Sequence, residues 1–210
     1  MGLEELLARI GELKRSEVAN LIKKRMEEFE HIGRGSNEEL FKELSFCLLT
    51  ANYSAEGGIR IQREIGDGFI TLSLDELTRE LRCLGHRFPR ARAEYIVEAR
   101  RFLPRLREIL SSFDDEKALR EWLARNIKGL GFKEASHFLR NIGFKNIAII
   151  DFHIVDLLVR YGLIERPRSI TKRRYLEIEG ILEKIADRAN LTLAELDLYL
   201  WYIETEKVLK

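Results

Sequence analysis

Apolar side chains recur every three or four residues along most of the chain, which is the spacing of one face of an α-helix. Leu3, Leu6 and Ile10 show this spacing near the start, and residues 40–48 repeat it. Alternating β-branched stretches, which would indicate strands, are nearly absent. The sequence therefore predicts an all-α fold.

Glycine and turn-forming residues interrupt the helical spacing at intervals. They cluster at HIGRGSNEE, GDGF, HRFP, SSFDDE, KGLGF and NIGFKN. This spacing predicts roughly ten helices joined by short loops. Because neither an internal repeat nor a low-complexity linker separates these segments, we expect one domain over residues 1–210 with a functional cleft between two lobes. The middle lobe would cover about 36–142, and the second would combine the N-terminal helix with about 143–210.

The net charge of the chain is close to zero, so the protein as a whole is not a polycation. Thirty-six Lys and Arg balance thirty-five Asp and Glu in the 210 residues, so nucleic-acid binding would need a local patch. Seven arginines in residues 86–108 and the segment RPRSITKRRY are candidates, although either is also consistent with a solvated helix face.

No apolar run approaches the roughly 20 residues that cross a bilayer, so no membrane partner is expected. The start shows no secretion signal, which favours a cytoplasmic location.

Cysteine content limits the metal chemistry. Cys47 and Cys83 are the two cysteines of the chain, and two thiols cannot form a four-thiolate zinc or iron–sulfur site. Both lie in apolar, helical contexts and are expected to be reduced core residues. We expect no metal ion and no redox cofactor.

Residues 120–143 contain two helices joined by a tight turn. The first helix is expected to end near Asn126 and the second to begin at Lys133, with Gly129 and Gly131 between them. Glycines at both positions allow a positive φ and let backbone N–H groups converge on an anion at the positive end of the second helix. The segment therefore predicts a phosphate-binding hairpin.

This apolar-x-Gly-apolar-Gly-x-Lys pattern resembles the helix-hairpin-helix of DNA repair glycosylases, with Leu130 as the residue that anchors the hairpin in the core. Non-catalytic DNA-binding proteins carry similar hairpins, so the motif alone leaves catalysis open. Asp151 follows Lys133 by eighteen residues, at the N-cap of a helix running to about Tyr161. Alone, Asp151 is consistent with a cap and Lys133 with a surface residue. Together they match the glycosylase superfamily, in which bifunctional enzymes carry both.

The resemblance implies a role for each residue. The Asp151 carboxylate would stabilise positive charge that develops on deoxyribose as the N-glycosidic bond breaks. Lys133 would attack C1′ and form a Schiff base that permits β-elimination of the 3′ phosphate. His153 matches a phosphate-contacting position.

Four further segments narrow the family. LLTANYSAEGG, GHRFPRARAEYIV, GFKEASHFLRNIG and the ending DLYLWYIETEKVLK resemble the archaeal-type 8-oxoguanine DNA glycosylases/lyases over most of residues 36–210, and the cysteine cluster of endonuclease III-type enzymes is missing. The resemblance implies a bifunctional repair enzyme that excises 8-oxoguanine and cleaves the abasic strand. Its partner would be double-stranded DNA containing 8-oxoguanine, bound by a monomer at the nucleoid.

Four residues are candidates for handling the lesion. By resemblance, Asn52 would enter the gap left by the flipped nucleotide, and the terminal Lys210 would help to distinguish 8-oxoguanine from guanine. Trp201 and Phe88 are candidates for stacking on the extruded base. Each residue also has a purely structural interpretation. Asn52 is consistent with a loop or helix-capping residue, Trp201 and Phe88 with core aromatic residues, and Lys210 with a frayed helix end.

Two other functions stay open. One is a helix-hairpin-helix glycosylase for another oxidised base, which the missing cysteine cluster disfavours by resemblance. The other is a non-catalytic DNA-binding module that uses Gly129 and Gly131 only to hold phosphate. The pair of Lys133 and Asp151 favours an enzyme, because phosphate binding alone requires no carboxylate nearby.

Overall fold

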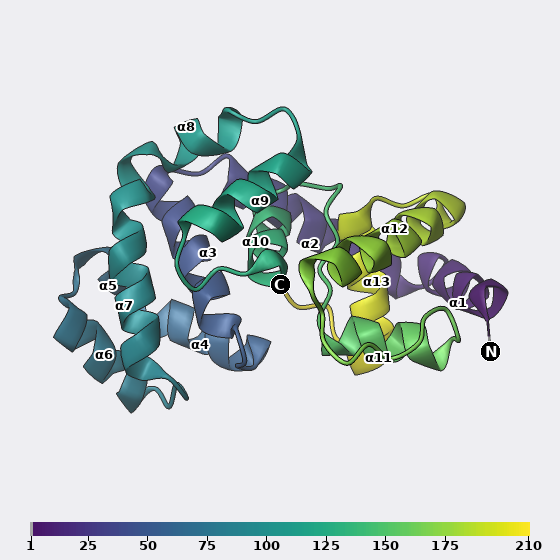
Figure 1. Cartoon of the computed structure of the whole chain (residues 1–210), viewed down its shortest axis with the longest axis horizontal. Helices are drawn as coiled ribbons and strands as arrows, with labels where there is room; N and C mark the ends of the chain where they lie inside the picture. The colour runs from purple at the N-terminus through teal and green to yellow at the C-terminus, as the bar shows by residue number, and fades with distance from the viewer. Residues whose placement is uncertain (1) are drawn as a thin grey trace. The chain divides into compact units, whose positions relative to one another are not determined.

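A computed structural model describes residues 2–210, and every regular element in that range is a helix (Figure 1). The predicted all-α fold is confirmed. The α-helices, in chain order, are α1 (Leu3–Lys14), α2 (Glu17–Gly33), α3 (Asn37–Thr50), α4 (Ala55–Ile65), α5 (Gly68–Thr71), α6 (Leu74–Cys83), α7 (Pro89–Ala99), α8 (Leu106–Ser111), α9 (Glu116–Asn126), α10 (Phe132–Asn141), α11 (Phe152–Arg160), α12 (Lys172–Ala189) and α13 (Leu193–Thr205). A 3-10 helix, η1 (Arg100–Arg105), joins α7 to α8. None of these helices is long and apolar enough to span a membrane.

The chain divides into two compact units. The middle unit is Glu30–Ile142, and the terminal unit combines the residues up to Phe29 with Gly143–Lys210. Helix α2 contributes to both, because the boundary falls near its end instead of at about residue 36. The hairpin lies entirely in the middle unit, and Asp151 lies in the terminal unit.

Helix α3 is the centre of the middle unit. It contacts α4, α5, α7, α8, α10 and η1. Ser36 and Glu39 form a capping box at its start, and apart from Lys42 every residue from Leu40 to Thr50 is buried. A helix that is buried on nearly all sides along most of its length lies inside a domain, so α3 forms the core of the middle unit.

The terminal unit is built from α1, most of α2, and α11 to α13. Helix α13 packs against α11 and α12, while α1 contacts α12 and α13. Apolar stripes on these helices face one another and form this unit's own core. The residues of α11 that enter it are Ile154, Val155, Leu157 and Leu158.

The prediction for the cysteines is half wrong. Cys47 is buried in α3 and free, but Cys83, also free, is exposed at the end of α6. The buried stripe of α6 includes Leu77 and Leu81, and a residue two positions beyond Leu81 points to the opposite side of a helix. Cys83 is therefore outside the core.

Candidate active site

The hairpin between α9 and α10 is a tight turn whose apolar residues face the core. Ile127 and Leu130 are buried, and the Leu130 amide donates to the Ile127 carbonyl at 3.1 Å. Gly129 has φ +85°, and a Cβ there would lie 2.2 Å from the Tyr95 ring. The backbone angle and the close approach of Tyr95 both require glycine at position 129.

Gly131 does not use the positive φ that a glycine allows. This residue has φ −81° and ψ −176°, an extended conformation that any residue adopts, and it is the N-cap of α10. As the N-cap, Gly131 makes no side-chain bond to the start of α10. Its small size lets an anion approach the backbone of this helix start, which is a different contribution from a turn angle.

Lys133 lies half-buried on the first turn of α10, which begins one residue earlier than expected, at Phe132. The predicted apolar face of α10 is buried, as confirmed for Ala135, Phe138, Leu139 and Ile142. Beneath the first turn, the buried Arg120 guanidinium carbon lies 4.9 Å from the centre of the Phe132 ring. Packing on both sides therefore sets the orientation of the turn that carries Lys133.

A buried carboxylate anchors the other end of α10. Glu43, on α3, accepts a hydrogen bond from the Asn141 amide at 2.6 Å and another from the Gln62 amide at 3.1 Å. Glu43 is 2% exposed, so these bonds form away from water. They join α3, α4 and α10 and restrict sliding of α10 along α3.

Asp151 caps α11, as its position in the sequence predicted. Its carboxylate accepts from the Ile154 amide at 3.0 Å. The buried segment before it, residues 147–150, is held by α12. Tyr175 donates to the Ala148 carbonyl at 2.7 Å and accepts from the Ile150 amide at 3.3 Å, and Glu179 accepts from the Ala148 amide at 3.1 Å. These bonds hold the backbone that presents Asp151.

His153 and Trp201 are neighbours in the terminal unit. The exposed His153 ring meets Trp201 edge to face, with centroids 4.8 Å apart and an interplanar angle of 81°. Within residues 2–210, the buried Trp201 Nε1 has no hydrogen-bond partner. After α13, Glu206 has φ +56°, and Arg25 of α2 donates to the Val208 carbonyl at 3.4 Å, so the segment leading to Lys210 contacts α2.

Asn52 and Phe88 lie on two loops of the middle unit. Asn52 is exposed between α3 and α4 and has φ +58°, a conformation that asparagine tolerates better than most residues. Phe88 precedes α7 and is 40% exposed, so it is not a core residue. The guanidinium carbon of Arg87 lies 5.0 Å from the centre of its ring.

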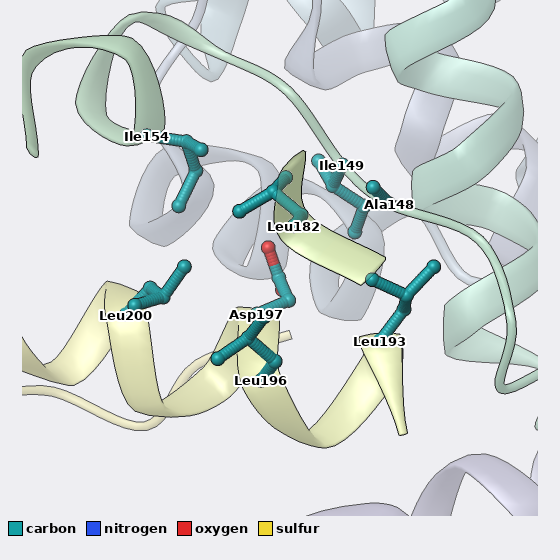
Figure 2. Close-up of a pocket in the computed structure, with 8 residues that line it drawn as sticks. All are labelled: Ala148, Ile149, Ile154, Leu182, Leu193, Leu196, Asp197 and Leu200. Carbon is teal, nitrogen blue, oxygen red and sulfur yellow. The ribbon is translucent and has the colours of Figure 1, made fainter. Parts of the chain in front are cut away.

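A small apolar cavity lies in the terminal unit behind Asp151. Figure 2 shows that it is lined by side chains of the segment before α11 and of α11, α12 and α13, with the Asp197 carboxylate among leucines. Its volume of about 10 Å³ is that of one water molecule. A purine base does not fit there, so this cavity is not the base pocket.

Comparison with known proteins identifies the family. A family model described as 8-oxoguanine DNA glycosylase matches residues 22–191. The chain is 62% identical to the 8-oxoguanine DNA glycosylase/AP lyase of Korarchaeum cryptofilum, with 100% of both chains covered. The chain belongs to the 8-oxoguanine DNA glycosylase family.

Solved structures of this glycosylase family agree with the fold. The Methanocaldococcus jannaschii 8-oxoguanine glycosylase/lyase, in complex with a 15mer DNA containing 8-oxoguanine, matches with a TM-score of 0.95 and 57% identity, covering 98% of this chain and 100% of that one. The Thermotoga maritima 8-oxoguanine DNA glycosylase gives a TM-score of 0.93 at 50% identity, covering 99% and 100%. The resemblance to the archaeal-type glycosylases is confirmed, and the family extends to bacteria.

The two units of this family member each carry part of the predicted site. The middle unit brings together Gly129, Gly131 and Lys133 on the hairpin, and it also carries Asn52 and Phe88. The terminal unit carries the other four predicted residues: Asp151, His153, Trp201 and Lys210.

Sequence analysis missed the buried polar residues that support these glycosylase elements. Their common signal is a polar side chain among apolar neighbours, as with Glu43 before Leu44 and Glu179 after Ile178. A buried polar group needs partners, so such positions point to a hydrogen-bonded network. The residues missed are Glu43, His86, Arg92, Arg120, Tyr175 and Glu179.

Proposed function

We propose that this chain is a bifunctional 8-oxoguanine DNA glycosylase/AP lyase acting on double-stranded DNA. The observation that carries the proposal is Lys133 on the first turn of α10, directly after a hairpin whose Gly129 is required by φ and by Tyr95. Full-length similarity to relatives named 8-oxoguanine DNA glycosylase/AP lyase supports the substrate and both activities.

The hairpin and α11 hold the DNA backbone in this proposal. The backbone amides at the start of α10 donate to a phosphate, favoured by the positive end of the helix dipole. Gly129 and Gly131 let the phosphate approach the backbone. His153, exposed at the start of α11, contacts a second phosphate.

The extruded base is recognised by stacking and by polar contacts. Phe88 and Trp201 offer aromatic faces to the purine, and Asn52 enters the vacated stack, where its amide replaces part of the lost base pairing. Lys210 contributes to the choice of 8-oxoguanine over guanine. The two bases differ at O8 and at N7, which becomes a donor in 8-oxoguanine, so a polar partner left unpaired would reject guanine.

Two residues perform the chemistry. As the bond from C1′ to the base breaks, the base leaves with the bonding electron pair and takes up a proton, while Asp151 stabilises positive charge on the sugar. The Lys133 amine forms a bond to C1′ and gives up a proton. Opening of the sugar ring gives a Schiff base, and O4′ takes a proton. Loss of a C2′ proton then expels the 3′ phosphate, and water releases Lys133 by hydrolysis.

Borohydride trapping tests this mechanism. The chain is mixed with a duplex containing one 8-oxoguanine, reduced, and run on a denaturing gel beside guanine and oxidised-pyrimidine duplexes. We expect a covalent complex with 8-oxoguanine alone, lost in Lys133→Gln and kept in Lys128→Gln, because Lys128 is an exposed hairpin lysine paired with Glu98 at 3.5 Å.

Other outcomes would redirect the assignment. Trapping with only a pyrimidine lesion would keep the mechanism and overturn the substrate. Absence of trapping with every lesion would favour a lysine-independent glycosylase or a non-catalytic DNA-binding module. Strand cleavage unchanged in Lys133→Gln would refute the role of Lys133.

A further inference from the structure

Two loops of the middle unit are bound together by long-range hydrogen bonds. One loop follows α3 and carries Asn52, and the other precedes α7 and carries Phe88. Tyr53 donates to the Gly85 carbonyl at 3.3 Å, and Arg60, on α4, donates to the Leu84 carbonyl at 2.9 Å. Asn52 and Phe88, both proposed to contact the lesion or its vacated position, therefore lie on loops that are hydrogen-bonded to each other's flanking residues.

His86 is the central connection between these loops. It is 4% exposed, and its Nε2 lies 3.0 Å from the Leu49 carbonyl oxygen in the last turn of α3. The Phe88 amide donates to its Nδ1 at 3.0 Å. A carbonyl only accepts and an amide N–H only donates, so the ring is neutral with its proton on Nε2. Burial also lowers the His86 pKa, which favours the neutral form.

Arg92 adds a second connection. Its guanidinium is nearly buried and donates at 2.5 Å to the carbonyl of Ala51, the residue before Asn52. The same guanidinium carbon lies 5.9 Å from the centre of the Phe88 ring and 5.7 Å from that of Tyr95, whose ring packs over Gly129. Arg92 thus links the Asn52 turn to the loop of Phe88 and to the hairpin.

We propose that His86 is a positioning residue for base extrusion: its two ring nitrogens set the Asn52 and Phe88 loops relative to each other. The inference rests on the proposed function and assigns His86 no contact with the reacting atoms. The Leu49 carbonyl is one of the last four of α3, which lack helical partners, so His86 also satisfies a helix end.

Comparing the two proposed activities distinguishes a defect in loop positioning from a defect in folding. Excision of 8-oxoguanine requires a paired base to leave the stack, whereas a preformed abasic site has no base to extrude. Displacement of the loops should therefore slow excision much more than cleavage at an abasic site. Loss of folded protein would reduce both activities together.

Three variants test this difference. His86→Gln keeps a donor near the Nε2 position, His86→Asn keeps an acceptor near the Nδ1 position, and His86→Ala removes both. We expect His86→Ala to lower single-turnover excision by about 10- to 100-fold, with the other two variants in between. Cleavage and borohydride trapping of a preformed abasic duplex should stay within about 3-fold of the unsubstituted chain, because Lys133 is unaffected. A 2-aminopurine beside the lesion should report weaker extrusion by its fluorescence.

His31→Ala is the matched control, because His31 is an exposed histidine on α2 and should change neither activity. Thermal melting checks folding, and if His86→Ala does not fold, His86→Gln and His86→Asn carry the test. Equal losses on both substrates, or excision unchanged in the variants, would overturn the positioning role. An unsubstituted chain inactive on both substrates would overturn the proposed function and this inference with it, which separates the two failures.

Discussion

Asp151 combines a structural and a chemical contribution in one carboxylate. It accepts the Ile154 amide at the start of α11, as an N-cap does, and its charge is proposed to stabilise the sugar during excision. Sequence alone supports both interpretations, because the N-cap position and the catalytic position coincide. An amide substitution separates them.

Asp151→Asn should keep the fold and lose most base excision. Asparagine caps helices about as well as aspartate, so the bond from the Ile154 amide is retained, but the negative charge is removed. We expect single-turnover excision to fall by about 100-fold or more, with a melting temperature close to that of the unsubstituted chain. Excision at the original rate would show that the charge of Asp151 does not contribute, and Asp151→Ala, which loses both functions, is the comparison.

Gly129 and Gly131 belong to one motif but have different structural roles. The Gly-x-Gly spacing allows a positive φ at both positions, and of the two glycines Gly129 adopts one. Tyr95, far away in the sequence, adds the second constraint by packing against the Cα of Gly129. The motif therefore identified the hairpin, but the neighbouring helix distinguished the two glycines.

The hairpin and α10 act as one element whose position depends on its neighbours. Leu130 anchors the turn, Phe132 packs beneath it on Arg120, and Asn141 binds Glu43 at the far end of the helix. The sequence predicted the buried face of α10, and its first residue to within one position. It did not reveal the partners of that face.

Two glycine substitutions should change stability in opposite directions. Gly129→Ala forces a side chain into a left-handed conformation and against the Tyr95 ring, so we expect a loss of about 1–2 kcal/mol or more. Gly180→Ala lies within α12, where a Cβ meets nothing within 4 Å, and should gain about 0.5–1 kcal/mol. Urea unfolding midpoints measure both changes. A neutral or stabilising Gly129→Ala would contradict the strained turn.

Positive and negative charges are balanced in the whole molecule, and many of them form ion pairs at the surface. Exposed pairs such as Arg90 with Asp75 at 2.7 Å and Arg105 with Glu108 at 2.9 Å contribute little to stability individually, because water screens them. Stability therefore rests chiefly on the apolar cores of the two units. Collectively, however, the surface carboxylates predict how stability depends on pH.

Acid should destabilise the chain through these carboxylates. Hydrogen bonding from Ser73 holds the pKa of Glu76 below its ordinary range, and Arg105 and Arg173 do the same for the pKa values of Glu108 and Glu177. A carboxyl whose pKa is lower in the folded state stabilises that state above its unfolded pKa, and the contribution disappears as the pH falls through the folded value.

The melting temperature should accordingly fall as the pH drops below about 4, measured by circular dichroism in buffers of constant ionic strength. Glu76→Gln removes one of these carboxylates and should make the decrease shallower. A melting temperature that stays constant or rises between about pH 5 and 3 would refute this assignment.

Local spacing in the sequence was sufficient for the all-α class, the hairpin, the buried face of α10, the cap at Asp151 and the resemblance that led to the family. These properties depend on residues within one or two helical turns, where backbone geometry relates sequence distance directly to spatial distance. The long-range contacts emerged from the folded chain: His86 with Leu49, Arg92 with Ala51, and α12 with the segment before Asp151. Each joins residues distant in sequence, and periodicity contains no information about which helices a compact core brings together.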